Sequence, residues 1–250
     1  MPARVDQASD PEIVADLATV RLGTAFFRRA LNRLNDQDLN GASLLPGWSR
    51  RHVVAHVGYN ARALARLVDW AATGIETPMY SSPDARTAEI EFGATLPPEA
   101  LRNLIEHSAI DLDVRWRDLP ADRWSYPVVT AQGRTVPAAE TVWLRCREIW
   151  LHAVDLDSGC RLDQVPARVL SRLIGDIYRT WVGRGTGPLP HLVATDTADQ
   201  WGSAADDGST VSGTLVSLAG WAMGRMSPET RAGALSSTRA EAVGPAPRWL

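Results

Sequence analysis

Lysine is absent from this chain, and all 26 basic residues are arginine. This excludes Schiff-base and lysine-nucleophile chemistry. Cysteine is almost as scarce: Cys146 and Cys160 are too few for a disulfide framework, and we expect both to be buried or chemically neutral. No segment approaches the roughly 20 apolar residues that span a bilayer, and the N-terminal residues lack a signal peptide's apolar stretch. We therefore expect a cytoplasmic protein without a membrane segment.

The remaining composition is that of an ordinary globular protein. Hydrophobic residues make up 45% of the chain and charged residues 22%, and 250 residues suffice for one large or two smaller domains. The net charge of -3 gives no reason to expect nucleic acid as a partner.

The first part of the chain has the apolar periodicity of amphipathic helices. Four helices are predicted: one beginning at Asp10-Pro11 with an apolar stripe from Ile13 to Leu34, one from Ser49 to about Ala72, one from about Pro98 to Arg117, and one from Pro137 to near Asp157. Between them, residues 73–98 are expected to form a long loop, and residues 124–134 look irregular. Four such helices predict a helix bundle over residues 1–160.

The sequence beyond Gly159 has a different character. It predicts a helix at 166–182, short strands at 192–195 and 209–211, a helix at 214–223, and an extended tail at 244–250. Mixed elements in a short segment indicate a small α/β C-terminal domain over residues 161–250, so the fold class is α+β.

The predicted fourth helix is apolar almost all round, yet it carries a polar stripe that includes Glu148 and His152. Their i, i+4 spacing places both side chains on one helix face. A buried carboxylate needs a partner, which could be an arginine such as Arg145 or Arg147, or a metal ion. One carboxylate and two imidazoles form a recurring zinc ligand set with an open coordination position.

The second imidazole of such a set would come from the predicted second helix. Both His56 and His52, one turn earlier, are candidates there, and the pattern does not choose between them. An ordinary core histidine and a salt-bridged glutamate explain the same residues without a metal.

Several segments resemble the mycothiol-dependent maleylpyruvate isomerase family. Residues 45–60 read LPGWSRRHVVAHVGYN, residues 130–137 TAQGRTVP and residues 147–155 REIWLHAVD. Shorter matches are ETPMY at 76–80, VSGTL at 211–215, GR at 224–225 and PRWL at 247–250. The resemblance covers nearly the whole chain in order. It implies a DinB-like four-helix bundle that binds a divalent metal, expected to be zinc, followed by a small α/β C-terminal domain.

The resemblance also implies residue roles. Its metal ligands correspond to His56, Glu148 and His152, which leaves His52 outside the set, and its important C-terminal arginine corresponds to Arg225. In the family, mycothiol is the cofactor and maleylpyruvate is converted to fumarylpyruvate in the gentisate route of aromatic degradation. A thiolate adds to the double bond, the resulting single bond rotates, and elimination releases the trans isomer.

These roles fit the chemistry of the residue types. A coordinated metal ion deprotonates a thiol, and three protein ligands leave it a position. Arg225 would bind a substrate carboxylate or stabilise the enolate charge. Arg134 is a weaker candidate for binding an anion, and Asp155 is a candidate for orienting His152. Mycothiol and maleylpyruvate are thus the expected partners, and the protein is expected to be a monomer.

Two other functions stay open. A mycothiol S-transferase would use the same activated thiolate but stop after its addition to an electrophile. A zinc-binding regulatory protein would use the ion only to hold helices together, which requires a fourth protein ligand. Cys146 is a poor candidate for that ligand, because it lies roughly 200° around the helix from Glu148.

Overall fold

The chain forms two compact units, Met1–Cys160 and Arg161–Leu250. The structure is a computed structural model that describes residues 5–82, 84–203, 209–238 and 243–249. Its described residues combine α-helices with two small β-sheets, so the predicted α+β class is confirmed.

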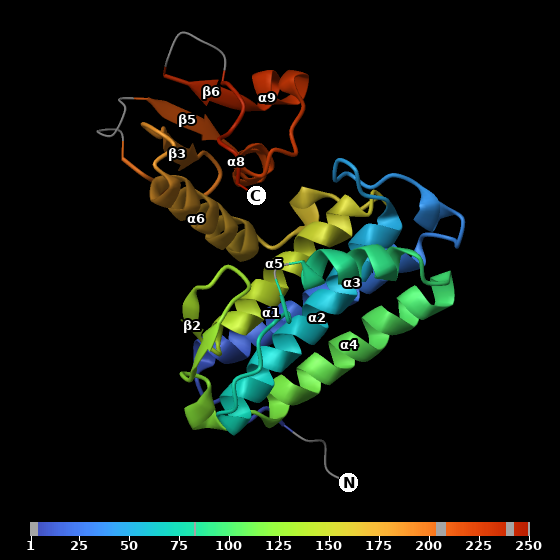
Figure 1. The fold of residues 1–250 in the computed structure, drawn as a ribbon. Helices are drawn as coiled ribbons and strands as arrows, with labels where there is room; N and C mark the ends of the chain where they lie inside the picture. Colours follow the sequence, from blue (N-terminus) through green and yellow to red (C-terminus); the bar gives the residue numbers. More distant parts are fainter. Residues whose placement is uncertain (1–4, 83, 204–208, 239–242, 250) are drawn as a thin grey trace. The chain divides into compact units, whose positions relative to one another are not determined.

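The first unit is built around four long helices (Figure 1). They are α1 (Pro11–Asn32), α2 (Arg50–Thr73), α4 (Pro98–Asp118) and α5 (Glu140–Asp155). Helix α1 packs against α5, and α2 packs against both α4 and α5. The predicted bundle of four long helices is therefore confirmed, with ends close to those expected.

The starts of the first two long helices follow from local sequence. The Asp10 carboxylate accepts the Glu12 N–H at 2.7 Å, and Pro11 lacks the N–H that a first helical turn leaves unbonded. At the start of α2, His52 Nδ1 accepts the Ser49 N–H at 3.2 Å and lies 2.7 Å from Ser49 Oγ. Ser49 and His52 thus form a capping box in which histidine replaces the usual Glu or Gln.

The predicted loop at 73–98 is wrong in its second half, because Ala85–Ala94 forms helix α3. Only Ile90 and Gly93 of this helix are buried, so the sequence shows no apolar stripe there. A Cβ on Gly93 would lie 2.6 Å from the Cβ of Ala55. The missing side chain therefore lets α3 approach α2 next to His56.

The prediction for the segment before the fourth helix also needs correction. Residues expected to be irregular contain β1 (Pro127–Val129), which pairs antiparallel with β2 (Thr135–Pro137). Pro137 ends this hairpin rather than opening the helix, and α5 begins three residues later, at Glu140. The buried Val128 anchors a hairpin whose strands are too short for period-two alternation to reveal them.

The core of the bundle is aromatic and aliphatic. Trp116 of α4 is 1% exposed, and its indole Nε1–H donates to Thr141 Oγ1 of α5 at 2.9 Å. This bond satisfies a donor that would otherwise be buried without a partner. It also ties α4 to the helix that carries Glu148 and His152.

The second unit consists of helices and a four-stranded sheet (Figure 1). The sheet order is β4-β3-β5-β6, with β3 and β5 parallel and the outer pairs antiparallel. Its elements are α6 (Ala167–Arg184), β3 (His191–Ala194), β4 (Gln200–Trp201), β5 (Thr210–Gly213), α8 (Leu215–Ala222), α9 (Pro228–Ala234) and β6 (Leu235–Ser237). The predicted helices and strands of this unit are confirmed to within a few residues, and β4, β6 and α9 are additional.

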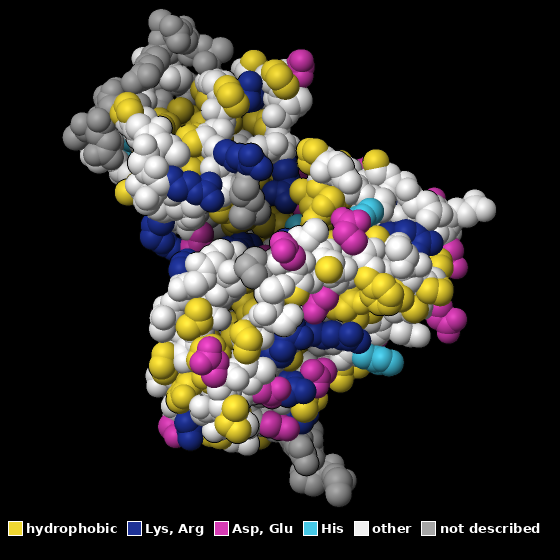
Figure 2. All heavy atoms as spheres, in the orientation of Figure 1, with side chains coloured by type: hydrophobic (Ala, Val, Ile, Leu, Met, Phe, Trp, Pro, Cys, Tyr) yellow, Lys and Arg dark blue, Asp and Glu magenta, His cyan; other side chains and the backbone are white. Residues whose placement is uncertain are grey.

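Charges on the bundle surface are locally balanced. In Figure 2, arginine and acidic side chains lie next to one another over the first unit. Arg115 and Asp111 form one such exposed pair at 2.9 Å. Exposed pairs of this kind stabilise a fold by only about 0–1 kcal/mol each. Within the described part of the chain, no helix has the length and apolarity to cross a membrane.

Candidate metal centre

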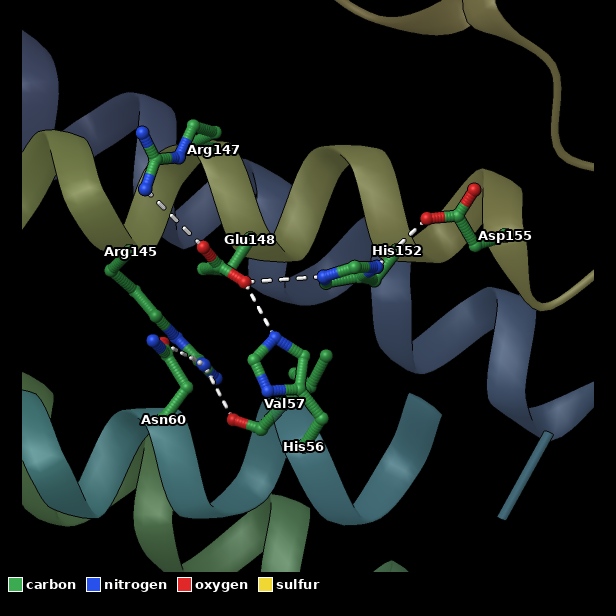
Figure 3. Close-up of polar contacts among 8 residues, drawn as sticks. All are labelled: His56, Val57, Asn60, Arg145, Arg147, Glu148, His152 and Asp155. Atoms are coloured by element: carbon green, nitrogen blue, oxygen red, sulfur yellow. Dashed lines mark hydrogen bonds and ion pairs between the residues drawn. The ribbon is translucent and has the colours of Figure 1, made fainter. Parts of the chain in front are cut away.

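Three side chains from two helices converge between α2 and α5 (Figure 3). His56 Nε2 lies 2.7 Å from Glu148 Oε2, and His152 Nε2 lies 3.1 Å from the same oxygen. The three potential ligand atoms all lie within 4.8 Å of one another. Among the described residues, this group contains neither a cysteine nor a fourth acidic or histidine ligand.

Two members of the group keep some solvent exposure. The side chain of His56 is 5% exposed, whereas those of Glu148 and His152 are 16% and 13% exposed. Glu148 and His152 lie on one face of α5, as their i, i+4 spacing predicts. The residual exposure is what a site that admits a small ligand requires.

Burial and hydrogen bonding shift the pKa values of His56 and Glu148 and so determine the charges of these two side chains. Burial lowers the pKa of His56 to about 4, although its contact with Glu148 opposes the shift. Burial acts to raise the pKa of Glu148, but hydrogen bonds from His152 and His56 outweigh it and hold that pKa well below its usual value. At neutral pH the carboxylate is therefore ionised and His56 is neutral.

Asp155 contacts the third candidate ligand, His152, at the ring nitrogen that does not face Glu148. Its Oδ2 lies 2.8 Å from His152 Nδ1, and its side chain is fully buried. Burial acts to lower the pKa of His152, but hydrogen bonds to Asp155 and Glu148 raise it overall. Because a carboxylate accepts, Nδ1 carries a proton that it donates to Asp155, and Nε2 faces Glu148.

A proton or a metal ion between His152 and Glu148 would stabilise this arrangement. An unprotonated His152 Nε2 and the Glu148 carboxylate would repel each other at 3.1 Å without one. Neighbouring ligands of a tetrahedral zinc ion are about 3.4 Å apart, given metal–ligand distances of about 2.0–2.1 Å. The observed separations of 2.7 and 3.1 Å are shorter than that value, and no two of the three ligand atoms lie more than 4.8 Å apart. Their types and spacing fit a divalent ion with small shifts of the side chains.

The two arginines considered as partners of Glu148 behave differently. Arg147 Nη2 lies 3.6 Å from Glu148 Oε1, which leaves Oε2 to the histidines. Arg145 turns to α2 instead, where its Nη1 donates to Val57 O at 2.6 Å and to Asn60 Oδ1 at 3.1 Å (Figure 3). The ion pair with Arg147 therefore does not replace the contacts of Glu148 with His56 and His152.

Trp48 is a site neighbour that sequence reasoning missed. Its ring meets the His56 ring edge-on, with centroids 5.5 Å apart. The loop that carries it is fixed by a hydrogen bond from Leu44 N–H to Asp155 O at 2.9 Å. The tryptophan directly after the Pro46-Gly47 break, just before the helix with His56, was the available signal.

His52 and both cysteines lie outside the group. His52 is engaged in the α2 capping box, and its Nε2 lies 3.5 Å from Glu91. Cys146 and Cys160 are both buried, as expected, and neither forms a disulfide. The structure therefore brings His56, and not His52, next to Glu148 and His152.

The two arginines predicted to bind anions do not belong to the group of three candidate metal ligands. Arg134, in the β1–β2 hairpin, is 61% exposed and lies 3.7 Å from Glu140 at the start of α5. Arg225 belongs to the second unit, three residues after the end of α8, where its N–H donates to Gly220 O at 2.9 Å. The role of each stays a prediction.

The fold and the site together define a helical-bundle protein with a candidate metal centre and a second, α/β unit. A family model described as the mycothiol maleylpyruvate isomerase N-terminal domain matches residues 20–157. The crystal structure of the mycothiol-dependent maleylpyruvate isomerase is 44% identical to this chain with a TM-score of 0.88, and the match covers 95% of this chain and 97% of that one. A crystal structure of a histidine-to-alanine mutant of mycothiol-dependent maleylpyruvate isomerase matches over the same shares at 43% identity and a TM-score of 0.88. No curated protein matches.

The chain belongs to the mycothiol-dependent maleylpyruvate isomerase family. The resemblance seen in the sequence is thereby confirmed. The model match contains all three candidate metal ligands.

Proposed function

We propose that this protein is a mycothiol-dependent maleylpyruvate isomerase that holds a divalent ion, zinc by expectation, with His56, Glu148 and His152. The observation that carries the proposal is the 44% identity to such an enzyme over 95% of the chain. The proposal includes the gentisate route of aromatic degradation as the setting of the reaction. It also assigns the bundle as the metal-binding domain and Arg161–Leu250 as the second functional domain.

The ligand charges suit activation of a thiol. Glu148 contributes one negative charge and His56 is neutral, so a divalent ion with both imidazoles neutral leaves the group at +1. When bound, the ion supplies the charge that keeps a thiol deprotonated, and the mycothiol sulfur is the nucleophile for reversible addition to the substrate double bond. No cysteine of the protein is required.

The protein's own groups orient and shield the site. Asp155 fixes the His152 imidazole in the tautomer that presents Nε2. Trp48 packs against the ring of His56, whose side chain is only 5% exposed. Arg225, an arginine of the second unit, is proposed to bind a carboxylate of the dianionic substrate, which a guanidinium does in bidentate fashion.

The mycothiol S-transferase is the nearest alternative, because it would use the same three ligands. Its distinguishing outcome is loss of the thiol into a conjugate. A structural zinc site is disfavoured by the described residues, since they offer no fourth protein ligand and a closed site needs one.

One assay separates the three functions. Purified protein is supplied with zinc, mycothiol and maleylpyruvate, and NMR follows both the substrate double bond and the free thiol. The proposal predicts fumarylpyruvate with the thiol concentration unchanged, and no reaction without mycothiol. Thiol consumption without the trans isomer would identify a transferase, and tight zinc binding with neither product would identify a structural site.

Matched variants locate the activity. Glu148→Ala is expected to lose both zinc and isomerisation, because it removes the oxygen that both histidines contact. His107→Ala is the control, since His107 is an exposed histidine of α4 outside the group. Stoichiometric zinc and full activity in Glu148→Ala would refute the assignment.

A further inference from the structure

Arg145 is a charged residue in the bundle core whose position no proposed role yet explains. It is 2% exposed, and it is one of the largest fully buried side chains of the protein. Burial lowers the pKa of its guanidinium to about 10, so it is still charged at neutral pH. Removing such a charge from water is costly unless its contacts compensate.

Its contacts are neutral acceptors on the neighbouring helix. Arg145 Nη1 donates to Val57 O at 2.6 Å and to Asn60 Oδ1 at 3.1 Å. Among the described residues, no carboxylate lies within ion-pair distance of Arg145, although Glu148 acts on it electrostatically. A simple ion pair therefore does not account for the buried charge.

The acceptors of the Arg145 hydrogen bonds are sequence neighbours of the candidate ligand His56, and Arg145 itself is a neighbour of the candidate ligand Glu148. Val57 directly follows His56 on α2, and Arg145 lies one turn before Glu148 on α5 (Figure 3). Any movement that separated the two helices here would stretch the Arg145 hydrogen bonds and the contact of His56 with Glu148 together. The arginine is thus placed to control the separation of ligands that come from different helices.

A second arginine links α2 to the chain at the other end of α5. Arg50, at the start of α2, donates from Nε to Leu156 O at 2.7 Å and from Nη2 to Asp157 O at 3.0 Å. Those carbonyls directly follow the end of α5. The three candidate ligands therefore lie between two arginine contacts, one donated by each helix.

We propose that Arg145 is a positioning residue that holds α2 against α5 and thereby sets the separation of His56 from Glu148. The inference rests on the proposed metal centre. The buried guanidinium also adds positive charge beside that centre, which favours an anionic ligand such as a thiolate.

Cobalt(II) is the probe, because its visible absorption reports coordination geometry independently of isomerase activity. Arg145→Met removes the charge and both hydrogen bonds, and pairing it with Asn60→Leu removes the acceptor left behind. Replacement of a buried polar group together with its partner by apolar residues is often tolerated by a fold. Arg145→Lys keeps the charge, but its side chain ends one bond short of Nη1, the nitrogen that donates both hydrogen bonds.

The expected result is a loss of cobalt affinity of roughly tenfold or more, as for other residues that orient metal ligands. The cobalt spectrum should change in the double variant and in Arg145→Lys, while circular dichroism shows intact helices. Arg62→Met is the control, because Arg62 is an exposed arginine of α2 and should bind cobalt like the wild type.

Each outcome bears on a different claim. If the wild type does not bind cobalt, the proposed metal centre itself is wrong. If it binds and Arg145→Lys matches its affinity and spectrum, the positioning role is refuted while the metal centre stands. Should the double variant not fold, Arg145→Lys alone decides, since it keeps the buried charge.

Discussion

Replacing Asp155 with asparagine tests how the third ligand is held. The Asp155 carboxylate is fully buried and lies 2.8 Å from His152 Nδ1. Asparagine keeps the size and can still accept the Nδ1–H, but it removes the negative charge that makes the imidazole a stronger donor to a metal. The variant therefore isolates the charge of Asp155 from its shape.

The magnitude follows from the position of this contact behind a ligand. Partners that orient a ligating histidine typically contribute 10- to 100-fold in metal affinity, which corresponds to about 1.4–2.7 kcal/mol. Because the carboxylate is fully buried, solvent does not screen the contact, and we expect a loss within this range for Asp155→Asn.

Zinc competition against a chromophoric chelator measures this loss directly. Asp122→Asn is the matched control, because Asp122 is 81% exposed and pairs with Arg123 rather than with a candidate ligand. We expect the control to bind zinc like the wild type. Equal zinc affinity for Asp155→Asn and the wild type would refute the reasoning that Asp155 supports His152.

Two further predictions concern packing around α5. In Gly23→Ala, the new Cβ would lie 2.6 Å from Trp150 Nε1 and 2.8 Å from Ile149 Cδ1. Overpacking of this kind costs about 1–3 kcal/mol. That cost should exceed the gain in helix propensity, which is at most about 1 kcal/mol. Calorimetry should show a melting midpoint lower by roughly 2–4 °C per kcal/mol, and an unchanged or higher midpoint would contradict the packing argument. Thr141→Val leaves the Trp116 indole N–H buried without its acceptor and should cost about 1–3 kcal/mol in urea unfolding. Thr141→Ser keeps the hydroxyl as a control, and equal stability of the two variants would speak against this hydrogen bond.

The long helices could be predicted because their buried faces recur every three to four residues. On α4, for example, Leu101, Ile105 and Leu112 are all buried as their spacing predicts. Helix α3 lacks such a face, since its contact with α2 depends on the absence of a side chain at Gly93. A close approach of two backbones leaves no apolar pattern in the sequence.

The candidate site, like the fold, could be predicted from the sequence only in part. The spacing of Glu148 and His152 placed both on one face of α5, but the partner from α2 depended on which histidine faces inward. His52 follows Ser49 by three residues, which is the capping-box spacing, and this local signal could have separated it from His56. The roles of Arg145 and Trp48 depend on contacts across helices and loops that spacing along one chain segment does not encode.

The central claim is that a metal ion held by His56, Glu148 and His152 is required for isomerisation. Its most direct test is zinc titration of metal-free protein in the presence of mycothiol and maleylpyruvate, with the rate of fumarylpyruvate formation as the readout. The account predicts no activity at the start and a rate that saturates at one zinc per chain. Full activity in the metal-free protein would contradict it.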